Sequence, residues 1–303
     1  MKPKAAIYLA LLGMIWGASF LFIKISIESI PLFTFIAGRM ALGAFTLYLV
    51  LRLRGEHMPP LGRTWVPFLV IGALNAFVPY SLIAWGEQHI SSGLAAILNG
   101  AMPIFTVLLA HSFIPDERLS LGRAVGIVTG FIGVVIVTLP DLQQGLTFNL
   151  LGQLAVVLAA LSYALASVYT RRALRYTSPI KTSIGMLISG FVCTLPLILV
   201  LEKPLATHPT PAAWLSWVIL GVMGTAVAYI LYYWLIGNAG ATYTSLVTFI
   251  LPPIGVFWGA LILRETVAWE HLLGLVVIVT GILAVNGYLD RPLRRLKASL
   301  RPT

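Results

Sequence analysis

Apolar stretches of about 20 residues follow one another along the whole chain, separated by short polar connections. A helix of this length crosses the hydrocarbon core of a bilayer. No connection is long enough to hold a soluble domain, so the pattern predicts an all-α integral membrane protein. The ten predicted transmembrane helices cover residues 5–23, 33–51, 65–85, 93–113, 121–139, 149–170, 180–200, 213–236, 242–263 and 270–289.

The predicted helix at 93–113 is interrupted. Asn99, Gly100 and Pro103 stand within its apolar run, and a proline cannot donate to the helical backbone and crowds the preceding turn. We therefore expect this span to bend or loosen near Pro103. Taken alone, such a helix is more often an ordinary packed span that tolerates its proline.

The same pattern returns in the second half of the chain. At an offset of 149 residues, Thr248 takes the place of Asn99, and Pro252 takes that of Pro103. Two interrupted helices in matching positions of two halves are the best sequence indication of a transporter's binding site. We expect Pro103 and Pro252 to act as hinges, and the turns before them to face a central cavity.

Further matches extend this repeat over most of the chain. Tyr80, for example, matches Tyr229 at the same offset. Residues 1–140 and 149–290 each hold five predicted helices, and a basic tail follows at 291–303. Because five is odd, the second half must enter the membrane from the opposite side. This predicts two five-helix inverted repeats.

Composition excludes a soluble protein. The chain is 59% hydrophobic and 10% charged, with a mean hydropathy of +0.94, whereas soluble domains are about 25% charged. In the ten-span layout, sixteen of the 20 Lys and Arg residues fall on the side of the two termini and three on the other. Cytoplasmic loops carry such an excess, so we expect cytoplasmic termini in a cell inner membrane. The loops account for the net charge of +10, and no nucleic acid partner is expected.

Arg39 is the remaining basic residue and the one charge well inside a predicted helix. An ionisable residue at this depth indicates function by default. The alternative is that Arg39 pairs with backbone carbonyls or with Glu28 and only holds its helix. All ten acidic residues lie at span ends or in loops. Their position counts against a dedicated cation pump and favours facilitated or weakly coupled export.

Signatures of enzymes are missing from the sequence. It has no GxSxG, HExxH or phosphate-binding GxxxxGK(S/T) motif, and its five histidines are not at metal-ligand spacing. We expect no cofactor and no metal. An intramembrane lipid-modifying enzyme is the alternative from another class, and Asp116 and Glu117 at one membrane face give it thin support.

Several motifs follow one another in a fixed order along the chain. They are Trp16-Gly17-x-x-Phe20-x-x-x-Lys24, Arg39, Pro103 with Glu117, Gly126 with Gly133, Pro252 with Glu265, and Gly274 with Gly281. Their order and duplication resemble the EamA branch of the drug/metabolite transporter (DMT) superfamily. The resemblance implies ten helices with cytoplasmic termini, and export of small metabolites, amino acids among them. It also implies that helices 1 to 4 and 6 to 9 line a central cavity.

We therefore predict an inner-membrane exporter of small metabolites that works by alternating access, with amino acids, aromatic and hydrophobic ones included, as substrates. An aromatic, hydroxyl- and amide-bearing cavity suits zwitterions better than phosphorylated compounds, which call for several cationic clamps. Export of drugs or nucleobase-like compounds remains an alternative. The chain is expected in the lipid bilayer as a monomer or homodimer. The predicted substrate-binding residues are Trp16, Ser19, Arg39, Asn75, Tyr80, Asn99, Tyr163, Tyr229, Ser245 and Thr248.

Overall fold

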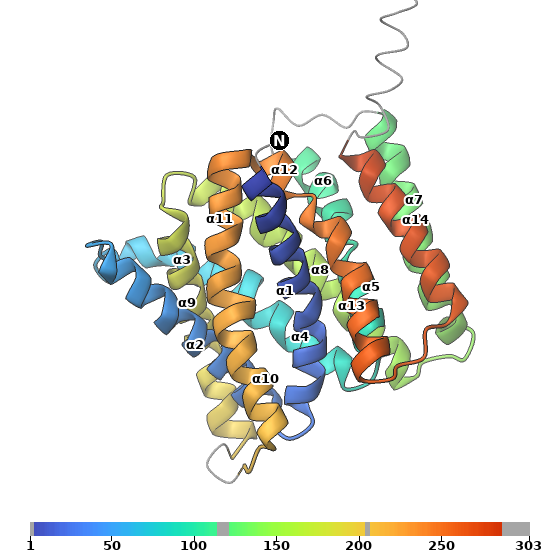
Figure 1. The fold of residues 1–303 in the computed structure, drawn as a ribbon, viewed down its shortest axis with the longest axis horizontal. Coiled ribbons are helices and arrows are strands. Elements are labelled where there is room, and N and C mark those ends of the chain that lie inside the picture. The colour runs from blue at the N-terminus through green and yellow to red at the C-terminus, as the bar shows by residue number, and fades with distance from the viewer. Residues whose placement is uncertain (1–2, 114–120, 204–206, 287–303) are drawn as a thin grey trace, which may run out of the picture.

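The computed structural model describes residues 3–113, 121–203 and 207–286, which form helices and turns and no strand (Figure 1). The helices are α1 (Pro3–Ile27), α2 (Leu32–Leu53), η1 (Arg63–Trp65), α3 (Val66–Gly72), η2 (Ala73–Phe77), α4 (Val78–Glu87), α5 (Ser92–Asn99), α6 (Met102–Phe113), α7 (Leu121–Leu142), α8 (Phe148–Ala173), α9 (Pro179–Leu201), α10 (Pro211–Gly221), η4 (Val222–Val227), α11 (Ala228–Ala239), α12 (Ala241–Thr244), α13 (Val247–Ile262) and α14 (Trp269–Val285).

The described helices have the length and composition of membrane spans. Eight continuous helical stretches are long and apolar enough to cross a membrane, and α13 and α14 are shorter apolar helices. Each of the ten predicted spans is helical, although 287–289 of the last one lie outside the described residues. The chain is therefore a multi-pass helical membrane protein. The start of α1 and the end of α14 lie at the same end of the bundle (Figure 1); the opposite end is called the far end below.

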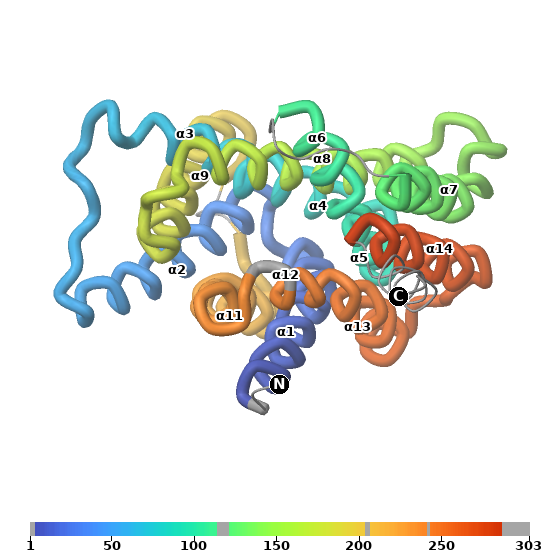
Figure 2. Tube along the Cα trace, turned by 90° about the horizontal axis from the view of Figure 1, so that it is seen from above, coloured from blue at the N-terminus to red at the C-terminus, as the bar shows by residue number. Residues whose placement is uncertain are grey.

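Helices α7 and α14 pack side by side at one edge of the bundle (Figure 2). A Cβ atom on Gly126 would lie 2.8 Å from the carbonyl oxygen of Gly281, and one on Gly133 would lie 3.0 Å from that of Gly274. These distances leave no room for a side chain, so the two helices meet at backbone contact. Small residues at membrane helix interfaces permit this close approach.

The predicted interruption near Pro103 is confirmed. The span consists of α5 and α6, which are separated at Gly100, and Pro103 is the second residue of α6. Proline is tolerated there because the first N–H groups of a helix have no helical acceptor. The matching span differs from the prediction, since it breaks at Ser245 and holds Pro252 inside α13. Membrane helices tolerate an internal proline when neighbours pack around it, and α5 packs against α13 at this point.

Two spans contain a π-helical segment that the sequence pattern did not predict. They are η2, between α3 and α4, and η4, between α10 and α11. The first residues of the two segments, Ala73 and Val222, are 149 positions apart, which is the offset of the repeat. Pro79 follows the first segment, but Ala228 stands at its place in the second. Proline therefore does not account for both segments, and π-helical turns are frequent at functional sites.

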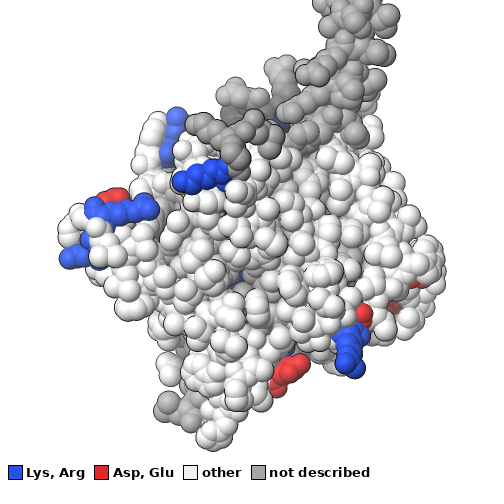
Figure 3. Space-filling model, viewed as in Figure 1, with Lys and Arg blue, Asp and Glu red and all other residues white. Residues whose placement is uncertain are grey.

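The charged side chains are unevenly placed along the bundle. Figure 3 shows Lys and Arg gathered towards the end where α1 begins, and a mostly uncharged band across the middle of the visible face. The last turn of α2 carries Arg52, and the last turn of α8 carries Arg171 and Arg172. An uncharged band between charged ends is what a hydrocarbon core requires.

Candidate functional site

Arg39 lies near the middle of α2 and is buried, with 7% of its surface exposed. Its Nε donates a hydrogen bond to Oγ1 of Thr225 at 3.2 Å. The guanidinium carbon lies 4.1 Å from the centroid of the Tyr80 ring, which is a cation–π contact. Glu28, considered above as a partner of Arg39, is exposed. Thr225 and Tyr80 hold Arg39 instead.

A hydroxyl group satisfies a backbone carbonyl at each π-helical segment. In η4, Oγ1 of Thr225 donates to the carbonyl oxygen of Leu220 at 3.0 Å. At η2, Oγ of Ser162 donates to the carbonyl oxygen of Leu74 at 2.7 Å. Buried carbonyls need such partners. Thr225 therefore links Arg39 to the π-helical segment, a role that the sequence analysis missed although Thr225 is a polar residue within an apolar run.

Aromatic side chains from both halves lie near Arg39 and are here called the aromatic cluster. Its members are Trp16, Tyr80, Tyr163, Tyr229 and Tyr233. The Trp16 and Tyr229 rings meet edge to face at 6.3 Å, and the Tyr229 and Tyr233 rings stack at 5.9 Å. Tyr163 and Tyr229 both lie within electrostatic range of Tyr80 and Arg39. Four members belong to the predicted substrate-binding residues named above, and Tyr233 does not.

Two other predicted site residues, Ser19 and Asn75, lie at the π-helical segments. The polar group of each has a partner within the protein. Oγ of Ser19 donates to the carbonyl oxygen of Ile15 at 3.0 Å, and a Cβ atom on Gly224 in η4 would lie 3.2 Å from the same Oγ. Asn75 belongs to η2, and its Nδ2 lies 2.8 Å from Sδ of Met186.

The remaining predicted residues lie where α5 crosses α13. Oδ1 of Asn99 is buried and has no hydrogen-bond partner among the described residues. Oγ1 of Thr248 donates to the carbonyl oxygen of Ser245 at 2.8 Å. A Cβ atom on Gly100 would lie 2.8 Å from Cγ of Pro252. The two predicted hinge regions thus touch each other at Gly100 and Pro252.

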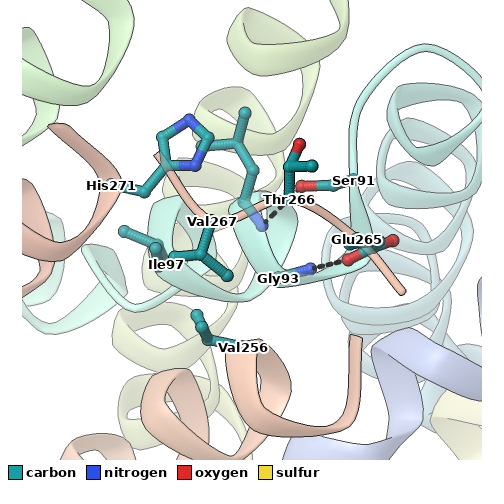
Figure 4. Close-up of a pocket in the computed structure, with 9 residues that line it drawn as sticks. Ser91, Gly93, Ile97, Val256, Glu265, Thr266, Val267 and His271 are labelled. Carbon is teal, nitrogen blue, oxygen red and sulfur yellow. Dashed lines mark hydrogen bonds between the residues drawn. The ribbon is translucent and has the colours of Figure 1, made fainter. Parts of the chain in front are cut away.

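At the far end, Glu265 caps the start of α5 (Figure 4). Its carboxylate accepts hydrogen bonds from N–H of Ser92 at 2.7 Å, from Oγ of Ser92 at 2.9 Å and from N–H of Gly93 at 3.1 Å. The first N–H groups of a helix lack helical acceptors and favour an anion. The pocket beside this cap has a volume of about 10 Å³, which is the space of a single water. This pocket is too small for a metabolite, and the Glu265 cap joins α5 to the segment after α13.

Asp116 and Glu117, on which the enzyme alternative rested, lie outside the described residues. Within the described residues, no group of three or more His, Cys, Asp or Glu side chains is placed to hold a metal ion. The chemistry that the described residues bring together is therefore that of Arg39 and the aromatic cluster.

The comparisons with known proteins point to membrane transport. The sequence profile of the EamA-like transporter family matches residues 3–139 and 150–287. The transporter YoaV of Bacillus subtilis is 25% identical over 270 residues, which cover 89% of this chain and 92% of YoaV. The inner membrane transporter YedA of Escherichia coli K12 is 28% identical over 277 residues, which cover 91% of this chain and 88% of YedA. A solved crystal structure at 18% identity aligns with a TM-score of 0.67 over 94% of this chain and 98% of its own, and so shares the fold.

Proposed function

Because this chain belongs to the EamA-like transporter family, we propose that it exports amino acids, aromatic and hydrophobic ones included, by alternating access. The proposed location is the cell inner membrane, as for the relative named an inner membrane transporter. The choice of substrate rests on one observation: Thr225 and Tyr80 hold Arg39 beside the aromatic cluster.

The contacts of Arg39 leave most of its hydrogen-bonding capacity unused. A guanidinium has five N–H donors in a planar fork, and among the described residues only Nε of Arg39 has an acceptor, on Thr225. A guanidinium binds a carboxylate through two parallel hydrogen bonds. The Tyr80 ring against its face fixes the plane of the fork. Arg39 therefore suits the carboxylate of a substrate, and the aromatic cluster suits an apolar side chain.

Contacts between matching positions support an inverted repeat. In sequence, Gly126 matches Gly274 and Gly133 matches Gly281. In space, Gly126 packs on Gly281 and Gly133 on Gly274. A two-fold axis in the membrane plane produces this exchange of partners, and the matching π-helical segments agree with it. Inverted repeats of this kind underlie alternating access around a midplane site.

The distribution of charge supports cytoplasmic termini. Basic side chains gather at the end of the bundle where α1 begins (Figure 3), and cytoplasmic loops carry an excess of Lys and Arg. In this orientation the far end, with the Glu265 cap, faces the outside. The basic tail at 291–303 lies outside the described residues.

Binding of L-phenylalanine and L-phenylalaninol to the purified protein tests the proposed role of Arg39. Phenylalaninol keeps the ring and the amino group but lacks the carboxylate. We expect Arg39→Gln to weaken phenylalanine binding about tenfold or more, because a hydrogen bond to a charged group contributes about 1.5–3 kcal/mol and about 1.4 kcal/mol is a factor of ten. Phenylalaninol binding should change little.

Arg54→Gln is the matched control, because Arg54 is exposed just after the end of the same helix. It should bind both compounds as the wild type does. Equal binding of both compounds to wild-type and Arg39→Gln protein would contradict carboxylate recognition. That result would favour export of compounds without a carboxylate, such as drugs or nucleobase-like molecules.

A further inference from the structure

Glu87, at the end of α4, carries a buried carboxyl group that the proposed binding site does not use. The residue lies at a span end, as predicted, but it is 0% exposed. Both of its carboxyl oxygens are buried, and neither has a hydrogen-bond partner among the described residues. A buried polar group without a partner is rare in proteins and calls for an explanation.

The neighbouring charged groups at the far end are satisfied by other partners. The Lys24 ammonium donates to the carbonyl oxygen of Glu87 at the end of α4 and to that of Ile90 just after it. Glu265 accepts its hydrogen bonds from the start of α5. Among the described residues, the buried Glu87 carboxyl has no donor.

The electrostatic surroundings of Glu87 come from three other parts of the chain. The charged groups that act on its carboxyl are Lys24 of α1, Arg39 of α2 and Glu265 of the segment after α13. The ring of His89, in the turn after α4, faces the start of α8 and stacks on Phe148 at 5.2 Å. Among the described residues, neither Lys24 nor Arg39 forms an ion pair with the Glu87 carboxyl.

An ionised carboxylate in such a place is far more costly than the neutral acid. Burial of a charge without hydrogen bonds carries a large desolvation cost. In addition, Glu87 ends α4, and the C-terminal end of a helix disfavours a negative charge. The arrangement therefore fits a protonated carboxyl group for as long as α1, α4 and α5 are packed together at the far end.

We propose that Glu87 is a proton-binding site of the transport cycle. Its carboxyl group is neutral while the far end is packed and becomes a carboxylate when that end opens to water. The proton comes from water and returns to water, and only the O–H bond of the acid is formed and broken. Each closing of the far end then takes up a proton. This inference rests on the proposed transport cycle, and it differs from the expectation of facilitated or weakly coupled export.

Infrared spectroscopy of the full-length protein in lipid, taken as the difference between the wild type and a variant, tests the protonation of Glu87 directly. It needs no substrate. We expect the carbonyl-stretch band of a protonated carboxylic acid in the wild type at neutral pH, and its loss in Glu87→Gln. Glu28→Gln is the matched control, because Glu28 is an exposed acid at the same end of the bundle, and it should keep the band. Absence of the band in the wild type, or its persistence unchanged in Glu87→Gln, would overturn the proposal.

Glu87→Asp keeps the test decisive if Glu87→Gln does not fold. The aspartate retains a carboxyl group one methylene shorter, so its environment and therefore the frequency of the same band must change. An unchanged band in folded Glu87→Asp protein would assign the signal to another acid and would likewise overturn the proposal.

The exchange of L-phenylalanine across the membrane of liposomes that contain the protein tests whether transport depends on this proton. A single required proton makes the exchange rate fall by up to about tenfold per unit rise in pH. We expect this fall in the wild type and in Glu28→Gln, and a flat profile in Glu87→Gln. A profile that is equally steep in Glu87→Gln would contradict the role of Glu87. If the wild type exchanges no phenylalanine, the proposed substrate is wrong, and the infrared result still decides on the proton site.

Discussion

The position of Arg39 depends on one hydroxyl group. Oγ1 of Thr225 accepts a hydrogen bond from Nε of Arg39 and donates one to the carbonyl oxygen of Leu220. Thr225 and Leu220 are both 0% exposed, so the carbonyl oxygen of Leu220 cannot turn to water if the hydroxyl is removed. The same atom thus fixes the guanidinium and closes the wider turn of η4.

Thr225→Val should therefore destabilise the protein although the two side chains have nearly the same size. We expect it to lower the free energy of unfolding by about 1–3 kcal/mol, the usual cost of a buried polar group left without its partner, and to weaken phenylalanine binding. Thr46→Val is the control, because Thr46 bonds the carbonyl oxygen of Leu42 in its own helix. Thermal unfolding in detergent measures the difference, and equal losses in the two variants would contradict the bridging role.

Residue-level prediction from the sequence succeeded where a residue is unusual in its surroundings. Arg39 could be identified because a charge inside an apolar run is rare. Thr225 could not, because helical hydroxyls commonly bond their own backbone and the sequence does not show which of them meets a neighbour. The burial of Glu87 was also hidden, since it arises from the packing of α1, α5 and α8 on α4.

At the scale of elements, the two halves break their matching spans differently. Pro103 stands in the first turn of α6, after the break, whereas Pro252 lies within α13. A proline in a sequence indicates a missing donor but does not set where the helix ends, because neighbouring helices can support the weakened turn. For the same reason the π-helical segments could not be predicted from apolar periodicity.

Pro103→Ala should join what the structure shows as two helices. Alanine restores an N–H that can bond the carbonyl oxygen of Asn99, and it is a good helix former. We expect the variant to fold but to exchange phenylalanine several-fold more slowly per folded molecule, because one access state is disfavoured. Pro252→Ala should have a smaller effect, because Pro253 still lacks its N–H in the same turn. Wild-type exchange in both variants would remove the two prolines from the mechanism.

At the scale of the whole molecule, the spans could be read from the sequence because bilayer thickness fixes the length of a membrane helix. The contacts at the far end could not. The Glu265 cap and the burial of Glu87 belong to one arrangement of the helices, and a transporter passes through more than one. The sequence pattern predicts the spans, which are common to all arrangements of the helices, and not the contacts of one arrangement.

The central claim is that this chain moves an amphipathic amino acid across a membrane unchanged. The most direct test is counterflow: liposomes that contain the purified protein are loaded with unlabelled L-phenylalanine and given labelled L-phenylalanine outside. We predict transient accumulation of label above that in protein-free liposomes, with the recovered label chemically unaltered by chromatography. Uptake equal to that of protein-free liposomes, or recovery of a chemically modified product, would contradict the claim.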